Sequence, residues 1–320
     1  MFSENGRRGL TLVETLIAVV LCAVVGAAVL QATRHALLLT VRFSHRTLAW
    51  ERGQNVLSIL KPRVLNASLG VTWERTGDKF QRSFGANWTP SPPPAKWTCG
   101  PVQVWQGYPS LMSPVPETDG VCRGRGLALL YAVPSSLKAK IDGNGPVSMD
   151  EGASCRIELV PPENRSELTE MLYYGRKNDL WSWVVFPFMR LPVYTRDYSG
   201  GKLTVQLAAD SALNATLLPY DEMHYLRSDR FQVQNETLYS ETLRQSWTSI
   251  QPRVDGVLEL WFELRPSKRL LDVWVLAAGG PATFGKSVRP QGWPDEAPWR
   301  SVFERYDLAV ARASWPVKNL

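Results

Sequence analysis

The sequence is poor in the residues that most often build reactive centres. Among 320 residues there are 3 histidines and 4 cysteines. His35, His45 and His224 have no metal-ligand spacing to one another or to the cysteines. A G-x-S-x-G nucleophile motif is also missing from the chain. We therefore expect no metal, no cofactor and no catalytic site, so the protein is not expected to be an enzyme.

Concentrated charge is missing as well. The formal net charge is +6, and no block of basic residues is interleaved with aromatic ones. This excess does not indicate binding to a specific nucleic acid. Asp221, Glu222 and Asp229 are close enough in sequence to form part of a calcium site. A solvated acidic turn explains these three residues equally well, and no metal is assigned to them.

What the sequence does contain is one long apolar run near its start. From Leu10 to Leu30 the chain is apolar except for two threonines, a glycine and Glu14. This is about the length of a membrane-spanning helix. A carboxylate in such a span costs about 2–3 kcal/mol on translocon scales. Glu14 is therefore expected to have a function and a partner.

The junction before this run has Gly9, an apolar residue after it, Thr11 and Glu14, behind a basic leader. This pattern resembles the class III signal of type IV pilins and type II secretion pseudopilins. It implies that a prepilin peptidase cleaves between Gly9 and Leu10 and methylates the new Leu10 amine. It also implies that Glu14, fifth in the mature chain, pairs with the N-terminal amine of a neighbouring subunit. Leu10 stands where the family most often has phenylalanine.

Charge alone does not set the orientation of the span. Arg7 and Arg8 precede it, whereas Arg34, Arg42 and Arg46 follow it. This count does not favour an N-terminus in the cytoplasm. The resemblance implies that topology: a single-pass protein of the bacterial inner membrane with its head in the periplasm, which later enters the pilus or pseudopilus at its tip.

Helical periodicity continues beyond the span. An apolar stripe suited to packing under a globular head recurs at helical spacing, at Ala49, Gly53, Val56, Leu57, Leu60 and Val64. Pro62 is expected to kink or end the pattern. The sequence therefore predicts one helix from Leu10 to about Lys61, with a membrane-embedded base and an amphipathic stalk.

Beyond Gly70 the pattern changes to short β-strands. Segments that are branched or aromatic and bounded by turn residues cover 126–133, 155–160, 181–189, 202–207, 257–264 and 271–276. Residues 231–239 predict a hairpin that turns at Asn235, and Asp255-Gly256 predicts a further turn. The fold class is thus α+β: a long N-terminal helix packed on a C-terminal antiparallel β-sheet head, as in pilins. The expected organisation is a leader at 1–9, the helix at 10–69 and the head at 70–320.

A proline-rich stretch lies at about 87–120. Its composition predicts an exposed loop or flap. The tryptophans in or beside it, Trp88, Trp97 and Trp105, form either a partner surface or a satellite core under the loop. Cys99, Cys122 and Cys155 allow three different single disulfides. Because Cys99 and Cys122 flank the loop, a disulfide between these two is our first choice.

Residues 280–287 match the G-x-x-x-x-G-K-[ST] pattern of a phosphate-binding loop. Such a loop needs a following helix, whose N-terminal amides hold the phosphates. The next eleven positions contain three prolines, and 33 residues remain after Ser287. We therefore interpret the match as accidental. A membrane-anchored nucleotide-binding protein that uses Lys286 is the remote alternative.

The predicted hairpin and the strand after it also resemble the C-terminal half of the larger minor pilins of the PilW type and of the J-type minor pseudopilin. The functional hypothesis is a minor type IV pilin that primes or caps pilus assembly. The implied partners are the prepilin peptidase, other minor pilins or pseudopilins, the major pilin, inner-membrane lipid and, at the tip, an adhesin. A J-type minor pseudopilin of a type II secretion system is the alternative.

Overall fold

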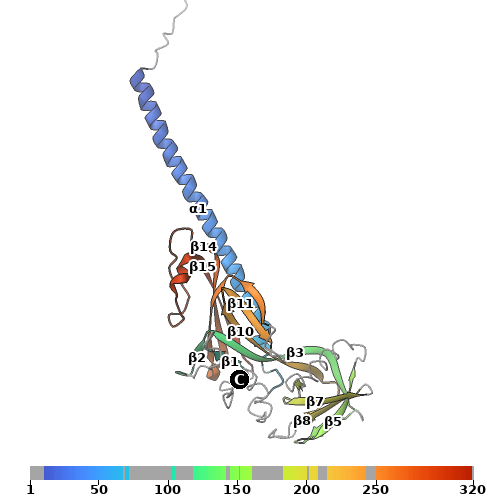
Figure 1. Cartoon of the computed structure of the whole chain (residues 1–320). Helices are drawn as coiled ribbons and strands as arrows, with labels where there is room; N and C mark the ends of the chain where they lie inside the picture. The colour runs from blue at the N-terminus through green and yellow to red at the C-terminus, as the bar shows by residue number, and fades with distance from the viewer. Residues whose placement is uncertain are drawn as a thin grey trace, which may run out of the picture.

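One long helix stands out from a β-rich head, and its N-terminal end lies far from that head (Figure 1). The computed structural model describes residues 11–67, 69–71, 102–105, 118–141, 145–150, 152–160, 183–199, 202–207, 215–242 and 250–318. For 196–199 and 250 it describes the backbone only. The combination of one apolar helix with antiparallel sheets confirms the predicted α+β class.

The helix α1 spans Leu12–Leu65 without a break. Its buried residues are the six of the predicted stripe, Ala49, Gly53, Val56, Leu57, Leu60 and Val64. The expected end near Lys61 was wrong, because Pro62 lies inside the last turn. Its carbonyl still accepts the Asn66 amide at 3.1 Å. A proline removes only its own amide bond, and the burial of Leu60 and Val64 keeps the last turn in place.

The C-terminal half of α1 packs on a four-stranded antiparallel sheet. The strands run in the order β15 (Tyr306–Pro316), β14 (Leu270–Pro281), β13 (Val257–Arg265) and β2 (Cys122–Gly124). The connection between β14 and β15 packs Trp293, Ala297 and Phe303 with side chains of the sheet in a separate core cluster. Because residues on both faces of β13 are covered, that strand is buried at every position but its last.

A larger antiparallel sheet has the strand order β1-β3-β5-β8-β7-β6-β10-β11-β12, and β3 also pairs with β10. Its strands are β1 (Val102–Trp105), β3 (Gly126–Ile141), β5 (Ser154–Val160), β6 (Trp183–Val185), β7 (Pro192–Ser199), β8 (Lys202–Leu207), β10 (Glu222–Gln234), β11 (Thr237–Thr242) and β12 (Ile250–Asp255). A small two-stranded sheet pairs β4 (Val147–Met149) with β9 (Ala215–Leu217). Since β3 pairs with both β5 and β10, the strands β3-β5-β8-β7-β6-β10 form a closed ring.

The long strands β3 and β10 connect two apolar cores. The proximal core joins α1 to β1, β13, β14 and β15 and contains Leu60, Phe231 and Phe262. The distal core lies among β4–β9 and the far ends of β3 and β10, and it contains Phe186 and Met223. Figure 1 shows β5, β7 and β8 at the end of the head farthest from the free end of α1.

The predicted turns are confirmed. Asn235 and Glu236 both have positive φ, 48° and 59°, and connect β10 to β11 as a two-residue hairpin. At Gly256, with φ of 73°, the chain passes from β12 in the nine-stranded sheet to β13 in the four-stranded sheet.

The proline-rich stretch differs from the expected irregular loop at one point. Residues 102–105 form the buried strand β1, paired with β3. The sequence Val-Gln-Val-Trp is rich in branched and aromatic residues, which suits an edge strand even between proline-containing segments. Trp105 is buried there, which fits the satellite-core reading for this tryptophan. Trp88 and Trp97 lie outside the described residues.

Candidate functional site

The first turn of α1 is closed by a capping box formed by Thr11 and Glu14. The Glu14 carboxylate accepts hydrogen bonds from the Thr11 amide and from the Thr11 hydroxyl, each at 2.9 Å. The Thr11 hydroxyl in turn accepts the Glu14 amide at 3.3 Å. These bonds satisfy backbone donors that a helix N-terminus otherwise leaves unpaired. In this monomer the Glu14 carboxylate is therefore held at the start of the helix by its own chain.

The N-terminal part of α1 lies outside the buried core of the described head. Every residue from 11 to 37 is exposed, including Leu12, Leu16, Leu21 and Leu30. The helix is long and apolar enough to cross a membrane. Its apolar residues occupy all sides rather than one stripe, which is the pattern of a helix surrounded by apolar material.

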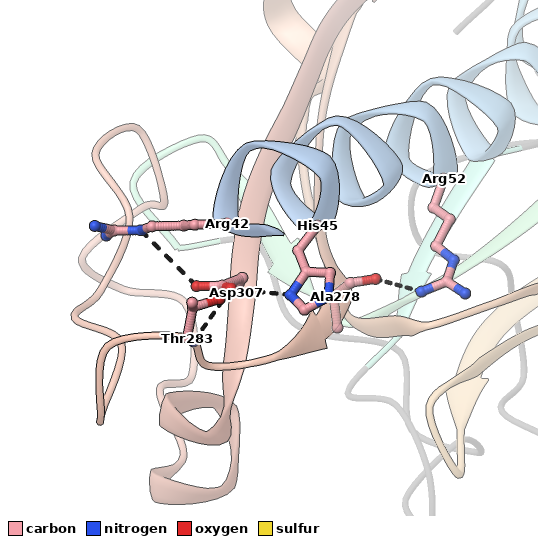
Figure 2. Close-up of polar contacts among 6 residues, drawn as sticks. All are labelled: Arg42, His45, Arg52, Ala278, Thr283 and Asp307. Carbon is pink, nitrogen blue, oxygen red and sulfur yellow. Dashed lines mark hydrogen bonds and ion pairs between the residues drawn. The ribbon is translucent and has the colours of Figure 1, made fainter. Parts of the chain in front are cut away.

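A cluster of polar contacts fixes α1 to the ends of β14 and β15, and we call it the junction cluster. Its residues are Arg42, His45 and Arg52 of α1 and Ala278, Thr283 and Asp307 of the head (Figure 2). The Asp307 carboxylate lies 3.1 Å from His45 Nδ1 and 3.9 Å from Arg42 Nε, and it also accepts the Thr283 hydroxyl. Arg52 donates to the Ala278 carbonyl at 2.5 Å. Asp307 is buried, so its charge is compensated by this cluster rather than by water.

Glycines allow the helix to approach the sheet closely. A Cβ at Gly279 would lie 1.6 Å from the His45 carbonyl oxygen. A Cβ at Gly53 would lie 2.6 Å from that of Ala311. Both distances are too short for any side chain, so glycine is required at Gly279 against the backbone of His45 and at Gly53 against the methyl group of Ala311. The junction therefore sets the direction in which α1 leaves the head.

A second polar contact holds the C-terminal end of α1. Arg63 Nε donates to Asp229 at 2.9 Å, and the buried Tyr131 hydroxyl donates to the same carboxylate at 2.8 Å. Burial, together with the nearby Asp229 carboxylate, raises the pKa of Tyr131 far above its usual value. Tyr131 is therefore a permanent donor, and this end of the helix is fixed to β3 and β10.

The candidate acidic residues do not converge on one site. Asp221 accepts the Phe188 amide, and burial raises the pKa of its carboxyl. Asp229 is engaged by Arg63 and Tyr131 instead. Within the described residues no group of three metal-ligating side chains comes together.

The phosphate-loop match has a structural explanation in the junction. Gly280 lies against the His45 ring, where a Cβ would be 2.6 Å from Nε2. Gly285 has a φ of 75° in the turn that follows. Lys286 is 83% exposed and pairs with Glu304 at 3.5 Å. Between Ser287 and residue 318 the structure has only the 3-10 helix Ser301–Arg305 and strand β15, so the α-helix that a phosphate-binding loop needs does not follow this turn.

Several predicted site residues lie outside the described ones. Gly9, Leu10 and Cys99 are among them, so cleavage, methylation and the disulfide stay predictions. Cys122 is buried in β2. Sequence reasoning missed the capping role of Glu14, although the T-x-x-E pattern of residues 11–14 before an apolar run is a signal for it. It also missed Asp307, because its partners His45 and Arg42 are more than 250 positions away.

Residues 5–30 match the family model for the prokaryotic N-terminal methylation motif. No curated protein and no solved structure matches the chain. The motif supports a place for this chain among the type IV pilins and pseudopilins. The same motif supports processing by a prepilin peptidase and a structural rather than an enzymatic role.

Proposed function

We propose that this protein is a minor type IV pilin that is stored in the inner membrane and then joins other minor pilins in a complex that primes or caps the pilus. The main support for the proposal is that the methylation motif and the exposed half of α1 occupy the same part of the chain. From residue 11, where the described helix region begins, to residue 30, the methylation motif lies on the exposed half of α1. A signal for processing and assembly thus lies on an apolar surface that must be covered by lipid or by other subunits.

The packing of α1 supports this function. Its exposed half can be surrounded first by lipid and later by apolar helices of other subunits, because both environments accept apolar side chains on every side. Its other half is fixed to the head by the proximal core and the junction cluster. Transfer from membrane to filament then needs no change inside the head.

Glu14 has two roles in this proposal. In the monomer its carboxylate caps Thr11. After cleavage at Gly9, the same carboxylate is close in sequence to the new Leu10 amine and can pair with the amine of a neighbouring subunit. A buried ion pair of this kind is favourable only when both charges are present and close.

The test separates capping from charge pairing. Glu14→Gln keeps a side chain that suits the capping box, and Thr11→Val removes the cap while keeping the carboxylate. We expect Glu14→Ala and Glu14→Gln to abolish co-purification with other minor pilins, and Thr11→Val to retain it. Membrane insertion should survive in all three. Normal assembly of Glu14→Gln would rule out the charge-pairing role.

The identity of the captured partners tests the rest of the proposal. Co-purification with minor pilins and a major pilin supports the pilus role. Recovery of type II secretion pseudopilins instead would replace it by the J-type alternative.

A further inference from the structure

One part of the head reaches back along α1 toward its apolar end. The ring of Phe284, in the turn after β14, lies 5.6 Å from the ring of His35 and 5.4 Å from the Arg42 guanidinium. Figure 2 shows the chain after Thr283 continuing past Arg42 on the N-terminal side of the junction. In Figure 1 the connection between β14 and β15 lies beside the middle of α1.

The charged residues of α1 place this turn relative to a membrane. Glu14 and Arg34 are the charged residues at the two ends of the apolar part of the helix, and their separation of 20 residues measures roughly 30 Å along its axis. This equals the thickness of the hydrocarbon core of a bilayer. Phe284 lies between the levels of His35 and Arg42, about 2 to 12 Å beyond Arg34. The headgroup layer occupies about the first 5–8 Å beyond the hydrocarbon core, that is, beyond the level of Arg34.

The turn is held in place by backbone hydrogen bonds, and it presents side chains that suit a membrane interface. Its two sides are tied to the 3-10 helix Ser301–Arg305, just before β15, by the bonds Ala282 N to Arg305 O and Ser287 N to Glu304 O, each 2.8 Å. Phe284 remains 38% exposed. Lys286 keeps most of its side chain in solvent although it pairs with Glu304. An aromatic ring beside a lysine is a common composition for a membrane interface, where the ring enters the headgroup layer and the cation meets phosphate.

We infer that the turn at 283–287 docks on the lipid headgroups of the membrane that holds α1, with Phe284 in the headgroup layer and Lys286 facing lipid phosphate. This rests on the membrane-stored form of the proposed function. The contact adds a second attachment point beside the helix and fixes the tilt of the head on the membrane. It must be released when the subunit leaves for the filament.

Photocrosslinking to lipid tests the contact. The full chain is placed in nanodiscs of phosphatidylcholine and phosphatidylglycerol, with p-benzoylphenylalanine in place of Phe284, Phe188 or Val20 in turn. Phe188 is the matched control, because it is 75% exposed but lies in the turn between β6 and β7, beside Phe186 and Met189 of the distal core. Val20 lies in the apolar half of α1. We expect mass spectrometry to detect lipid adducts at positions 284 and 20 and none at position 188.

The outcomes distinguish this inference from the proposed function. Adducts at 20 without adducts at 284 would overturn the docking of the turn and leave the membrane-stored form standing. Equal adduct yields at 284 and 188 would also overturn it. An absence of adducts at position 20 would contradict the membrane span itself. It would overturn both the docking of the turn and the membrane-stored form.

A charge reversal tests the role of Lys286. With the crosslinker at position 284, Lys286→Glu should lower the share of phosphatidylglycerol among the adducts. Lys268→Glu is the control, because this exposed lysine lies at the opposite end of β14. An unchanged share in Lys286→Glu would refute the phosphate contact.

Discussion

The two halves of α1 belong to one unbroken helix but have opposite surroundings. Residues 11–37 are exposed throughout, whereas the stripe from Ala49 to Val64 is buried against β14, β15 and the other strands of the proximal core. The first half is apolar on every side, and the second is apolar on one. The comparison shows that the head completes its own core, while the first half of the helix depends on lipid or on other subunits.

The junction cluster marks the boundary between these halves. Arg42, His45 and Arg52 are the positions where α1 first makes polar bonds to the head, and Gly279 lets the backbones meet. The free half therefore projects from a fixed base rather than from a flexible linker.

The largest expected effect comes from matched truncations in the two halves. Leu60→Ala removes a fully buried side chain from the proximal core and should lower the free energy of unfolding of the head by about 2–5 kcal/mol. Leu21→Ala, in the exposed half, should leave that free energy unchanged. Urea unfolding of the full chain in detergent, followed by tryptophan fluorescence, measures both. Similar losses for the two variants would contradict the division of the helix.

The junction should respond less strongly. Asp307→Asn removes the charge that faces Arg42 and His45 and should cost about 1–3 kcal/mol in the same unfolding measurement, because buried donors lose an ionised acceptor. Asp295→Asn, at an exposed position of the β14–β15 connection, is the control and should have little effect. If Asp307→Asn left the free energy of unfolding unchanged, the cluster would not be what holds the helix.

The sequence predicted the regular parts of this fold because local patterns determine them. The stripe from Ala49 to Val64 follows helical periodicity, and the Asn235 hairpin follows turn chemistry. The junction cluster could not be predicted, since Asp307 and His45 are 262 positions apart and are brought together by the tertiary packing of α1 on β14 and β15. Pro62 was misjudged because tertiary packing outweighs the local preference of proline near a helix end.

The smallest expected effect is at Lys286. Lys286→Ala removes a solvated charge and should change the free energy of unfolding by no more than about 0.5 kcal/mol. Pilus assembly should survive it. Equilibrium binding of labelled ATP to the full chain in detergent checks the nucleotide-binding alternative. Saturable binding that disappears in Lys286→Ala would establish a phosphate site there and contradict our interpretation of residues 280–287.

The proposal that this chain is a processed pilin depends most directly on its mature N-terminus. We predict that, in cells with an active prepilin peptidase, mass spectrometry of the N-terminal peptide finds a chain that begins at Leu10 with a methylated amine. An intact start at Met1 in those cells, or cleavage after residue 30, would contradict the pilin assignment.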